Sequence, residues 1–497
     1  MYLKEENTMW IAAGNERIHM LPKMANRHGL VAGATGTGKT VTIKVLAETF
    51  SDMGVPVFMA DVKGDVSGLC RPGEPNNNVD ERVRTMGISD FSFGAYPVRF
   101  FDVYGKKGIP ARTTISNMGP NLIARILGLN ETQTGVLQIV FRVADDSGIL
   151  LLDLKDLRAM VRHTGENAKE YTIQYGSVST QTIGAIQRGL LTLESSGGDI
   201  FFGEPSLELR DWLAWDDTGR GMINILDCVT LFQSPMLYST FLLWMLSDLY
   251  EMMPEVGDLD KPRMVFFFDE AHLLFTETPK ILLQKIEQMV RLIRSKGVGV
   301  YFITQSPSDI PDTVLAQLGN TIQHALRAYT PKEQRALKAA AAAFRPNPDF
   351  KTETVLGELS TGEALLSLLD EKGAPRMVQR GFILPPRSFM GVAGPDLVER
   401  LTRESPLYSK YYQPIDRYSA YEHFQQQAQI EQQKKEQEAQ DAQRLKESRQ
   451  QAKPAPTQAP RSKSNGPLDR AISSAMSQAG RSLTRELIRG FMGNKKR

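Results

Sequence analysis

One eight-residue motif near the N-terminus constrains the fold of this chain more than any other feature. Residues 33–40 read Gly-Ala-Thr-Gly-Thr-Gly-Lys-Thr and fit the phosphate-loop pattern G-x-x-x-x-G-K-[ST] at every constrained position. The apolar run at 29–32 predicts a strand before the motif, and the apolar spacing of residues 41–50 predicts a helix after it. Because such a loop binds phosphate at a strand–loop–helix junction, this context predicts a nucleotide site in an α/β fold.

The residue types of the motif suit a triphosphate and its magnesium ion. Glycines let backbone N–H groups turn toward a phosphate, and the start of the following helix adds partial positive charge. We expect Lys39 to reach the β- and γ-phosphates and the hydroxyl of Thr40 to hold Mg²⁺. A Gly- and Thr-rich turn without a ligand is the alternative. The expected nucleotide-binding residues are Gly33, Ala34, Thr35, Gly36, Thr37, Gly38, Lys39, Thr40 and Val41.

An acidic pair supplies the second half of the expected site. Residues 263–268 form a mostly apolar run that predicts a central parallel strand, and Asp269 and Glu270 follow it directly. Because ligands collect at the carboxyl ends of parallel strands, we expect this pair beside the phosphate loop. Asp269 would bind Mg²⁺, mostly through water, and Glu270 would polarise the water that attacks the γ-phosphate. The alternative is a strand that merely ends in two acids.

Two neighbouring segments have weaker interpretations. The stretch 61–65, which follows a predicted strand at 55–60, would face the nucleotide side, with a solvated loop as an equal alternative. Residues 269–272 spell the Asp-Glu-Ala-His signature of one helicase superfamily, but the Ser-Ala-Thr motif and the Arg-rich final motif of those helicases are absent from the sequence. We therefore expect His272 to be a packed or helix-capping histidine.

The composition indicates a mostly globular chain of roughly two to four structural units, because 23% of its 497 residues are charged and 41% are hydrophobic. Cys70 and Cys228 lie far apart and show no disulfide or metal spacing, which suits a reducing cytosol. No signal-peptide pattern is present at the N-terminus, and the apolar stretch 236–250 contains Ser, Thr and Asp, which favours a buried helix over a membrane span. These features predict a cytoplasmic protein without integral membrane association.

The chain divides into parts of different character. Helical spacing dominates from about residue 115 to 215, between the phosphate loop and the acidic pair, where a simple nucleotide fold needs far fewer residues. We interpret this excess as a helical insertion. The predicted parts are the first core segment (1–114), the helical insertion (115–220), the second core segment (221–395), a Gln-rich and charged segment that is helical or disordered (396–452), a Pro-rich linker (453–466) and a basic amphipathic helix (467–497).

Three of these features together resemble the HerA–FtsK superfamily of ring-forming ATPases, and most of all its bacterial HerA-like branch. They are the phosphate loop, the Phe-Phe-Phe-Asp-Glu strand end at 266–270 and the Tyr-Phe-Ile-Thr-Gln strand end at 301–305. An Arg-Ser-Lys-Gly turn at 294–297 adds to the likeness, which covers roughly residues 10–390. The resemblance implies a RecA-like (ASCE) P-loop NTPase with a mainly parallel sheet, a helical insertion and a largely helical or disordered C-terminal tail.

The resemblance also implies roles for further residues. Gln305 matches the polar residue that the superfamily places between nucleotide and water, and Arg294 lies where it carries an arginine finger for the neighbouring subunit. Arg291 is the fallback for the finger, and a surface cation near a helix C-terminus is the alternative for Arg294. The implied catalytic residues are Lys39, Glu270, Gln305 and Arg294, the implied metal ligands are Thr40 and Asp269, and the cofactors are ATP and Mg²⁺.

The implied function is a Mg²⁺-dependent ATP hydrolase that forms a hexameric ring and moves DNA or another polymer. HerA proteins carry a β-barrel before the ATPase, and a phosphate loop at residue 33 leaves no room for it, so contacts made by that barrel do not carry over. Since no base-reading motif is present, we expect any duplex DNA to be bound without sequence preference. A second hypothesis is a nucleotide-gated scaffold that recruits a protein partner through its C-terminal tail.

The tail is the basic part of a nearly neutral chain. Residues 453–497 carry ten Lys and Arg against Asp469 and Glu486, a net charge of +8, whereas the whole chain carries +2, so the preceding residues sum to −6. A basic amphipathic helix there would dock a partner, self-associate, lie on a membrane surface or touch nucleic acid. Docking back on its own ring is the interpretation that we favour.

Overall fold

The computed structural model describes residues 1–451 with the exception of residue 258 and residues 277–279. Its strands are β1 (Tyr2–Leu3), β2 (Thr8–Ala13), β3 (Arg17–Met20), β4 (Gly29–Ala32), β5 (Val57–Asp61), β6 (Val98–Asp102), β7 (Ile109–Pro110), β8 (Ile223–Asp227), β9 (Met264–Phe268), β10 (Val298–Thr304), β11 (Asn320–His324), β12 (Glu363–Ser367) and β13 (Gln379–Ile383).

These strands form one sheet of mixed direction. Within the described residues it has 13 strands in the order β1-β2-β13-β12-β11-β4-β10-β9-β5-β8-β6-β7, with β3 paired to β2. The strands from β11 to β7 are parallel to their neighbours. The strands beyond β11 pair in antiparallel fashion. The predicted α/β class with a mainly parallel sheet is therefore confirmed.

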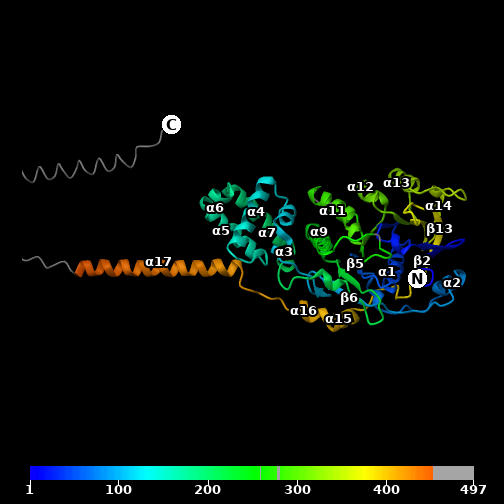
Figure 1. Ribbon diagram of the computed structural model, residues 1–497, viewed down its shortest axis with the longest axis horizontal. Helices are drawn as coiled ribbons and strands as arrows, with labels where there is room; N and C mark the ends of the chain where they lie inside the picture. The colour runs from blue at the N-terminus through cyan, green and yellow to red at the C-terminus, as the bar shows by residue number, and fades with distance from the viewer. Residues whose placement is uncertain (258, 277–279, 452–497) are drawn as a thin grey trace, which may run out of the picture. The chain divides into compact units, whose positions relative to one another are not determined.

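Helices cover the sheet and fill a long segment between two of its strands. They are α1 (Lys39–Asp52), α2 (Asn77–Thr85), α3 (Ile115–Ile126), α4 (Glu131–Asp146), α5 (Leu154–Glu166), α6 (Ala168–Tyr175), α7 (Thr180–Leu193), α8 (Asp199–Phe201), α9 (Pro235–Met252), α10 (Leu273–Thr276), α11 (Lys280–Ile293), α12 (Asp312–Leu315), α13 (Pro331–Ala342), α14 (Thr352–Glu358), α15 (Pro395–Glu404), α16 (Pro406–Tyr411) and α17 (Ala420–Gln451). Helices α3 to α8 lie between β7 and β8, and Figure 1 shows α4 to α7 gathered into one group.

The sheet separates two hydrophobic cores. Successive side chains of a strand point to opposite faces, so Phe266 and Phe268 of β9 enter one core while Val265 and Phe267 enter the other. The first core contains α9, which is the buried helix expected at 236–250. Because both faces of β9 are covered, all its side chains are buried and its sequence is an uninterrupted apolar run. Among the described helices, none combines the length and the apolar composition that crossing a membrane requires.

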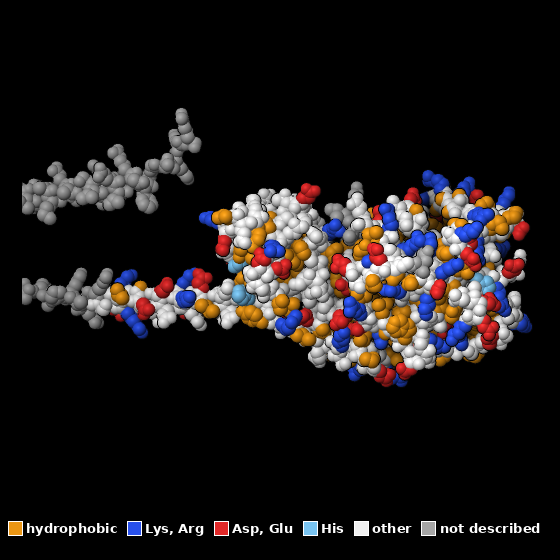
Figure 2. Space-filling view, in the orientation of Figure 1, with side chains coloured by type: hydrophobic (Ala, Val, Ile, Leu, Met, Phe, Trp, Pro, Cys, Tyr) orange, Lys and Arg blue, Asp and Glu red, His pale blue; other side chains and the backbone are white. Residues whose placement is uncertain are grey.

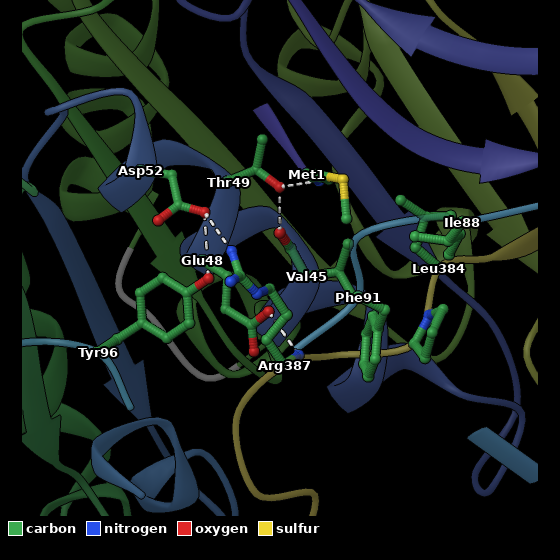
Figure 3. Close-up of a pocket in the computed structure, with 11 residues that line it drawn as sticks. Met1, Val45, Glu48, Thr49, Asp52, Ile88, Phe91, Tyr96, Leu384 and Arg387 are labelled. Atoms are coloured by element: carbon green, nitrogen blue, oxygen red, sulfur yellow. Dashed lines mark hydrogen bonds and ion pairs between the residues drawn. The ribbon is translucent and has the colours of Figure 1, made fainter. Parts of the chain in front are cut away.

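A C-terminal segment at 384–391 is fastened across the outer face of α1. Nζ of the buried Lys44 donates to three successive carbonyls of residues 389–391, at 3.0 to 3.1 Å. The carboxylate of Glu48 accepts from the backbone N–H groups of residues 387–388, at 2.9 and 3.0 Å. Figure 3 shows Glu48 among the side chains that meet on this face of the helix. The phosphate loop precedes α1, so these bonds fix the helix that carries the loop.

Residues 1–427 form one compact unit, and the described residues from 428 onward belong to a second unit. At the end of the first unit, the start of α17 is bonded to α5, because Oδ1 of Asp156 accepts from the hydroxyl of Ser419 at 2.6 Å and from the backbone N–H of Tyr421 at 3.0 Å. The Gln-rich segment is helical through α17, whose described side chains from Gln425 onward are exposed. The linker and the basic helix predicted after residue 452 lie outside the described residues.

On the face seen in Figure 2, Lys and Arg are interspersed with Asp and Glu.

Candidate active site

The loop at 33–40 joins β4 to α1 with glycines in conformations that other residues avoid. Gly33 has φ +156° and Gly38 has φ +112°. A Cβ atom at Gly33 would lie 2.5 Å from Cβ of His324, and one at Gly38 would lie 3.0 Å from Cα of Gly362. Side chains at these two positions would therefore both strain the backbone and collide with β11 and the β12 turn. The absence of side chains leaves the loop backbone free to surround a phosphate.

Lys39 points into this loop. Its Nζ donates to the carbonyl of Gly33 at 2.6 Å and to that of Ala34 at 3.1 Å. Burial lowers the pKa of Lys39, and the ammonium of Lys63 lowers it further, so a second cation lies close by. An ammonium whose described partners are two backbone carbonyls is well placed to exchange them for phosphate oxygens, which are stronger acceptors.

The acidic pair lies at the same edge of the sheet. Strand β10 separates β4 from β9, and all three are parallel, so their carboxyl ends meet at one edge. Burial raises the pKa of Asp269 to about 6. Glu270 has φ +46°, which is uncommon for a residue other than glycine and is typical of functional sites. Both carboxylates raise the pKa of Lys39 against the effect of burial, in keeping with the common edge at which β4 and β9 end.

The carboxylate of Glu270 is contacted on both sides. Nζ of Lys63 lies 2.5 Å from Oε1 of Glu270, and Nδ1 of His272 lies 3.2 Å from Oε2. Oε2 nevertheless has no hydrogen-bond donor among the described residues. His272, expected to be packed or helix-capping, is half-buried, with a side chain that is 31% exposed and an Nδ1 that faces Glu270. A buried carboxylate oxygen with an open acceptor position is suited to receive a hydrogen bond from water.

The last residue of β5 and the turn after it contribute Asp61 and Asp65 to this edge, in addition to Lys63. Asp61 ends β5 and accepts from the N–H groups of Gly64 at 2.7 Å and Val66 at 3.2 Å, which holds the turn in place. Burial, followed by the neighbouring carboxylate of Asp65, raises the pKa of Asp61 to about 7. The hydroxyl of Thr40 donates to Oδ2 of Asp65 at 2.9 Å. Sequence reasoning placed the stretch 61–65 near the nucleotide side but assigned it no contacts.

A buried histidine supports the loop from behind, and nothing in the sequence marked it. Nδ1 of His324 donates to the carbonyl of Glu363 at 2.9 Å, and Nε2 accepts from the hydroxyl of Thr42 at 2.8 Å. This assignment follows from the carbonyl, which can only accept. Burial lowers the pKa of His324 to about 4, so the ring is neutral at pH 7. The histidine thereby ties α1 to β11 and β12.

Gln305 and Arg294, the two residues taken from the family resemblance, lie at opposite ends of the central strand β10. Gln305 follows β10 directly, between β4 and β9, and is exposed at the edge that carries the loop. Arg294 begins the short helix Arg294–Lys296 before β10, and Arg291 lies in the last turn of α11 just before it. The 7 residues of β10 span about 23 Å, so Arg294 is remote from the phosphate loop of its own chain.

A large cavity adjoins the loop on the side away from the acidic pair. Its volume is about 1210 Å³, and its lining includes Gly38, Val41, Arg82, Phe382 and Met390. Phe382 is 38% exposed, and the guanidinium of Arg82 lies 5.0 Å from its ring centre. The cavity drawn in Figure 3 has a volume of only about 10 Å³, which is enough for about one water molecule. Of these two, the first has the size of a ligand pocket.

Comparison with known proteins gives a family and a fold. The family model described as "Helicase HerA-like C-terminal" matches residues 6–497. The plasmid coupling protein TrwB in complex with the non-hydrolysable GTP analogue GDPNP is similar, with a TM-score of 0.51 and 14% identity over 76% of this chain and 91% of that chain. TrwB in complex with ADP and Mg²⁺ gives a TM-score of 0.51 and 15% identity over 74% and 89% of the two chains. No curated protein matches. These likenesses confirm the predicted RecA-like P-loop fold.

Proposed function

Because the chain belongs to the helicase HerA-like C-terminal family, we propose that it is a Mg²⁺-dependent ATP hydrolase with its active site at the carboxyl ends of β4, β10 and β9. The family supports the coarser statement that the chain is a nucleotide-binding P-loop NTPase. The single observation that carries the proposal is that the phosphate loop with Lys39 and the acidic pair Asp269 and Glu270 follow the carboxyl ends of strands that β10 joins in one parallel sheet.

The donor set fits a triphosphate with its metal. Lys39 would hold the β- and γ-phosphates, and Thr40 and Asp269 would hold Mg²⁺, with Asp269 acting mostly through water. A hydroxyl has one proton and two lone pairs, so Thr40 can donate to Asp65 at 2.9 Å while its oxygen faces a cation. When bound, Mg²⁺ supplies neutralisation of the phosphate charge.

Glu270 would accept a proton from the attacking water at Oε2, which is buried and lacks a donor within the described part of the chain. Gln305 lies at the end of β10, between the strands that carry the two motifs, and would orient the same water. The nucleoside would occupy the cavity of about 1210 Å³ on the other side of the loop, where Phe382 offers an exposed ring for stacking.

The experiment that tests this function is ATP hydrolysis by the wild type and by Glu270→Gln and Lys39→Ala, each with and without Mg²⁺. We expect Glu270→Gln to keep ATP binding and to lower kcat by about a hundred-fold or more, because a general base contributes at least that factor. Lys39→Ala should lose binding as well. Unchanged turnover in Glu270→Gln would refute the assignment of the base.

We further propose a hexameric ring in which Arg294 serves the neighbouring subunit. Its position at the amino end of β10 keeps it about 23 Å from its own loop, so only another chain's phosphates are within its reach. Arg294→Ala and Glu270→Gln should each be inactive alone, whereas an equal mixture should regain turnover at interfaces that combine the two intact residues. Arg291→Ala serves as the matched control. A monomer with full turnover, established by mass measurement, would exclude the ring.

DNA is the polymer that we propose for such a ring. The family model is described as helicase-like, and TrwB is titled a plasmid coupling protein. Duplex DNA should raise the ATPase rate, and the effect should fall steeply with salt because phosphate contacts release counterions. Single-stranded DNA and RNA of the same length are the controls. A rate that is independent of every nucleic acid would remove DNA from the proposal.

The second candidate function is a nucleotide-gated scaffold. The observation that favours it is α17, whose exposed Gln-rich and charged surface has no apolar stripe suited to a core. Removal of residues 428–497 leaves the first compact unit whole. Loss of a bound protein partner with ATP hydrolysis retained would support the scaffold, and loss of DNA stimulation alone would support the motor.

A further inference from the structure

Lys63 contacts the carboxylate of Glu270, the proposed catalytic base, but the proposed function assigns no role to Lys63. Its Nζ lies 2.5 Å from Oε1 of Glu270 and 4.0 Å from Oδ2 of Asp269. Glu270 is almost fully buried, with a side chain that is 8% exposed, whereas the side chain of Lys63 is 39% exposed. The two partners therefore differ in freedom of movement, because the carboxylate of Glu270 is buried and the ammonium of Lys63 ends a long, flexible and partly exposed side chain.

The backbone of Lys63 is held beside the expected phosphate position. On one side, Asp61 accepts from the N–H of Gly64 at 2.7 Å. On the other side, Asp65 accepts from the hydroxyl of Thr40, the expected metal ligand, at 2.9 Å. The turn is thus tied both to β5 and to the first residues of α1. Lys63 lies between these two anchors in the chain, and its half-exposed side chain has the flexible stem by which a lysine reaches a phosphate.

Lys63 and Lys39 lie at the same edge of the sheet, because Lys39 follows β4, Lys63 follows β5 and the intervening strands are parallel. After burial, the ammonium of Lys63 is the largest influence that lowers the pKa of Lys39. Burial lowers the pKa of Lys63 as well, but Asp269 and Glu270 outweigh it and the net shift is upward. Two cations at one edge of the sheet attract an anion bound there, and a terminal phosphate competes with a carboxylate for the more exposed cation.

We propose that Lys63 is a ligand of the γ-phosphate, supplied by the same chain, and that it masks Glu270 whenever no γ-phosphate is present. The inference rests on the proposed ATP hydrolysis. In this scheme ATP draws Lys63 away from Oε1, and the carboxylate of Glu270 becomes more basic without its ion pair, so that Oε2 accepts a proton from water more readily. ADP has no γ-phosphate, so Lys63 stays on Glu270 when ADP is bound. The pair therefore lets the site distinguish ATP from ADP.

The test compares the binding of a non-hydrolysable ATP analogue and of ADP, both with Mg²⁺, to the wild type, Lys63→Met, Lys63→Arg and the control Lys106→Met. Lys106 is an exposed lysine in the turn after β6, at the same edge of the sheet. We expect Lys63→Met to bind the analogue about ten-fold or more weakly, because a hydrogen bond to a charged group is lost, and to bind ADP as the wild type does. Lys63→Arg should restore part of the affinity, and Lys106→Met should change neither ligand.

A double-variant cycle separates phosphate binding from a structural role. Glu270→Gln no longer competes for Lys63, so it should bind the analogue several-fold more tightly than the wild type, and this gain should vanish in Lys63→Met/Glu270→Gln. A lysine that only supported the fold would weaken ADP and the analogue equally in the single variant. That result, or unchanged analogue affinity in Lys63→Met, would overturn the proposal.

ATP binding and hydrolysis by the wild type show whether the proposed role of Lys63 fails alone or together with the proposed ATPase function. If the wild type binds and hydrolyses ATP but Lys63→Met retains full analogue affinity, only the role of Lys63 is wrong. If the wild type binds neither the analogue nor ADP, both proposals fall. Thermal unfolding of each variant shows whether a loss of affinity reflects a loss of folded protein.

Discussion

The contact between Asp65 and Thr40 gives the sharpest quantitative prediction. Asp65→Ala removes the acceptor that lies 2.9 Å from the Thr40 hydroxyl and that would orient its oxygen toward the proposed Mg²⁺. A hydrogen bond to a charged group contributes about 1.5–3 kcal/mol when it is well shielded. Asp65 is only half-buried, so we take the lower end, about 1.5 kcal/mol, which corresponds to a little more than a ten-fold change in an equilibrium constant. Partners of metal ligands commonly alter metal affinity by about ten-fold to a hundred-fold.

The assay is the Mg²⁺ concentration that gives half-maximal ATP hydrolysis at saturating ATP. It should rise about ten-fold in Asp65→Ala and less in Asp65→Asn, which keeps an acceptor but loses the charge. Asp61 holds the turn independently of Asp65, so the fold of the turn should persist, and thermal unfolding checks this. An unchanged Mg²⁺ requirement in a folded, active Asp65→Ala protein would refute the reasoning that Asp65 acts through Thr40.

Three further predictions concern the loop, the helix behind it and the adjoining cavity. Gly38→Ala should weaken nucleotide binding and lower the free energy of unfolding by about 1–3 kcal/mol, measured by titration and urea unfolding, because of its φ of +112° and the contact with Gly362. Burial lowers the pKa of Lys44 from 10.5 to about 8. Between pH 8 and pH 10.5 the unfolded chain therefore binds more protons at Lys44 than the folded chain does. The stability of the wild type relative to Lys44→Met should therefore rise by about 3 kcal/mol from pH 8 to 10.5, and a flat difference in urea unfolding would contradict it. Phe382→Ala should weaken ATP about ten-fold and leave inorganic triphosphate binding unchanged, and equal losses would exclude base stacking.

The sequence predicted what depends on local pattern. The octet at 33–40 and the apolar run that ends in Asp269 and Glu270 gave the two strand ends, because parallel strands bring their carboxyl ends together whatever lies between them in the chain. The stretch 61–65 was expected on the nucleotide side, but the contact of Lys63 with Glu270 and the role of His324 were not predicted, because such contacts depend on which strands become neighbours. The pairing of β5 with β9 brings Lys63 to Glu270, and the pairing of β11 with β4 brings His324 to the loop. The periodicity of apolar residues along the chain does not determine the order in which strands pair in the sheet.

The bond between Ser419 and Asp156 determines where mechanical load enters the folded body. A force applied to the C-terminal tail reaches the first compact unit at the start of α17 and passes at once to α5, through the 2.6 Å contact with the Ser419 hydroxyl and the 3.0 Å contact with the Tyr421 N–H. Helix α5 lies in the chain between β7 and β8 and not beside the phosphate loop. Tension on the tail therefore strains the inserted helices before it disturbs the strand ends where chemistry takes place.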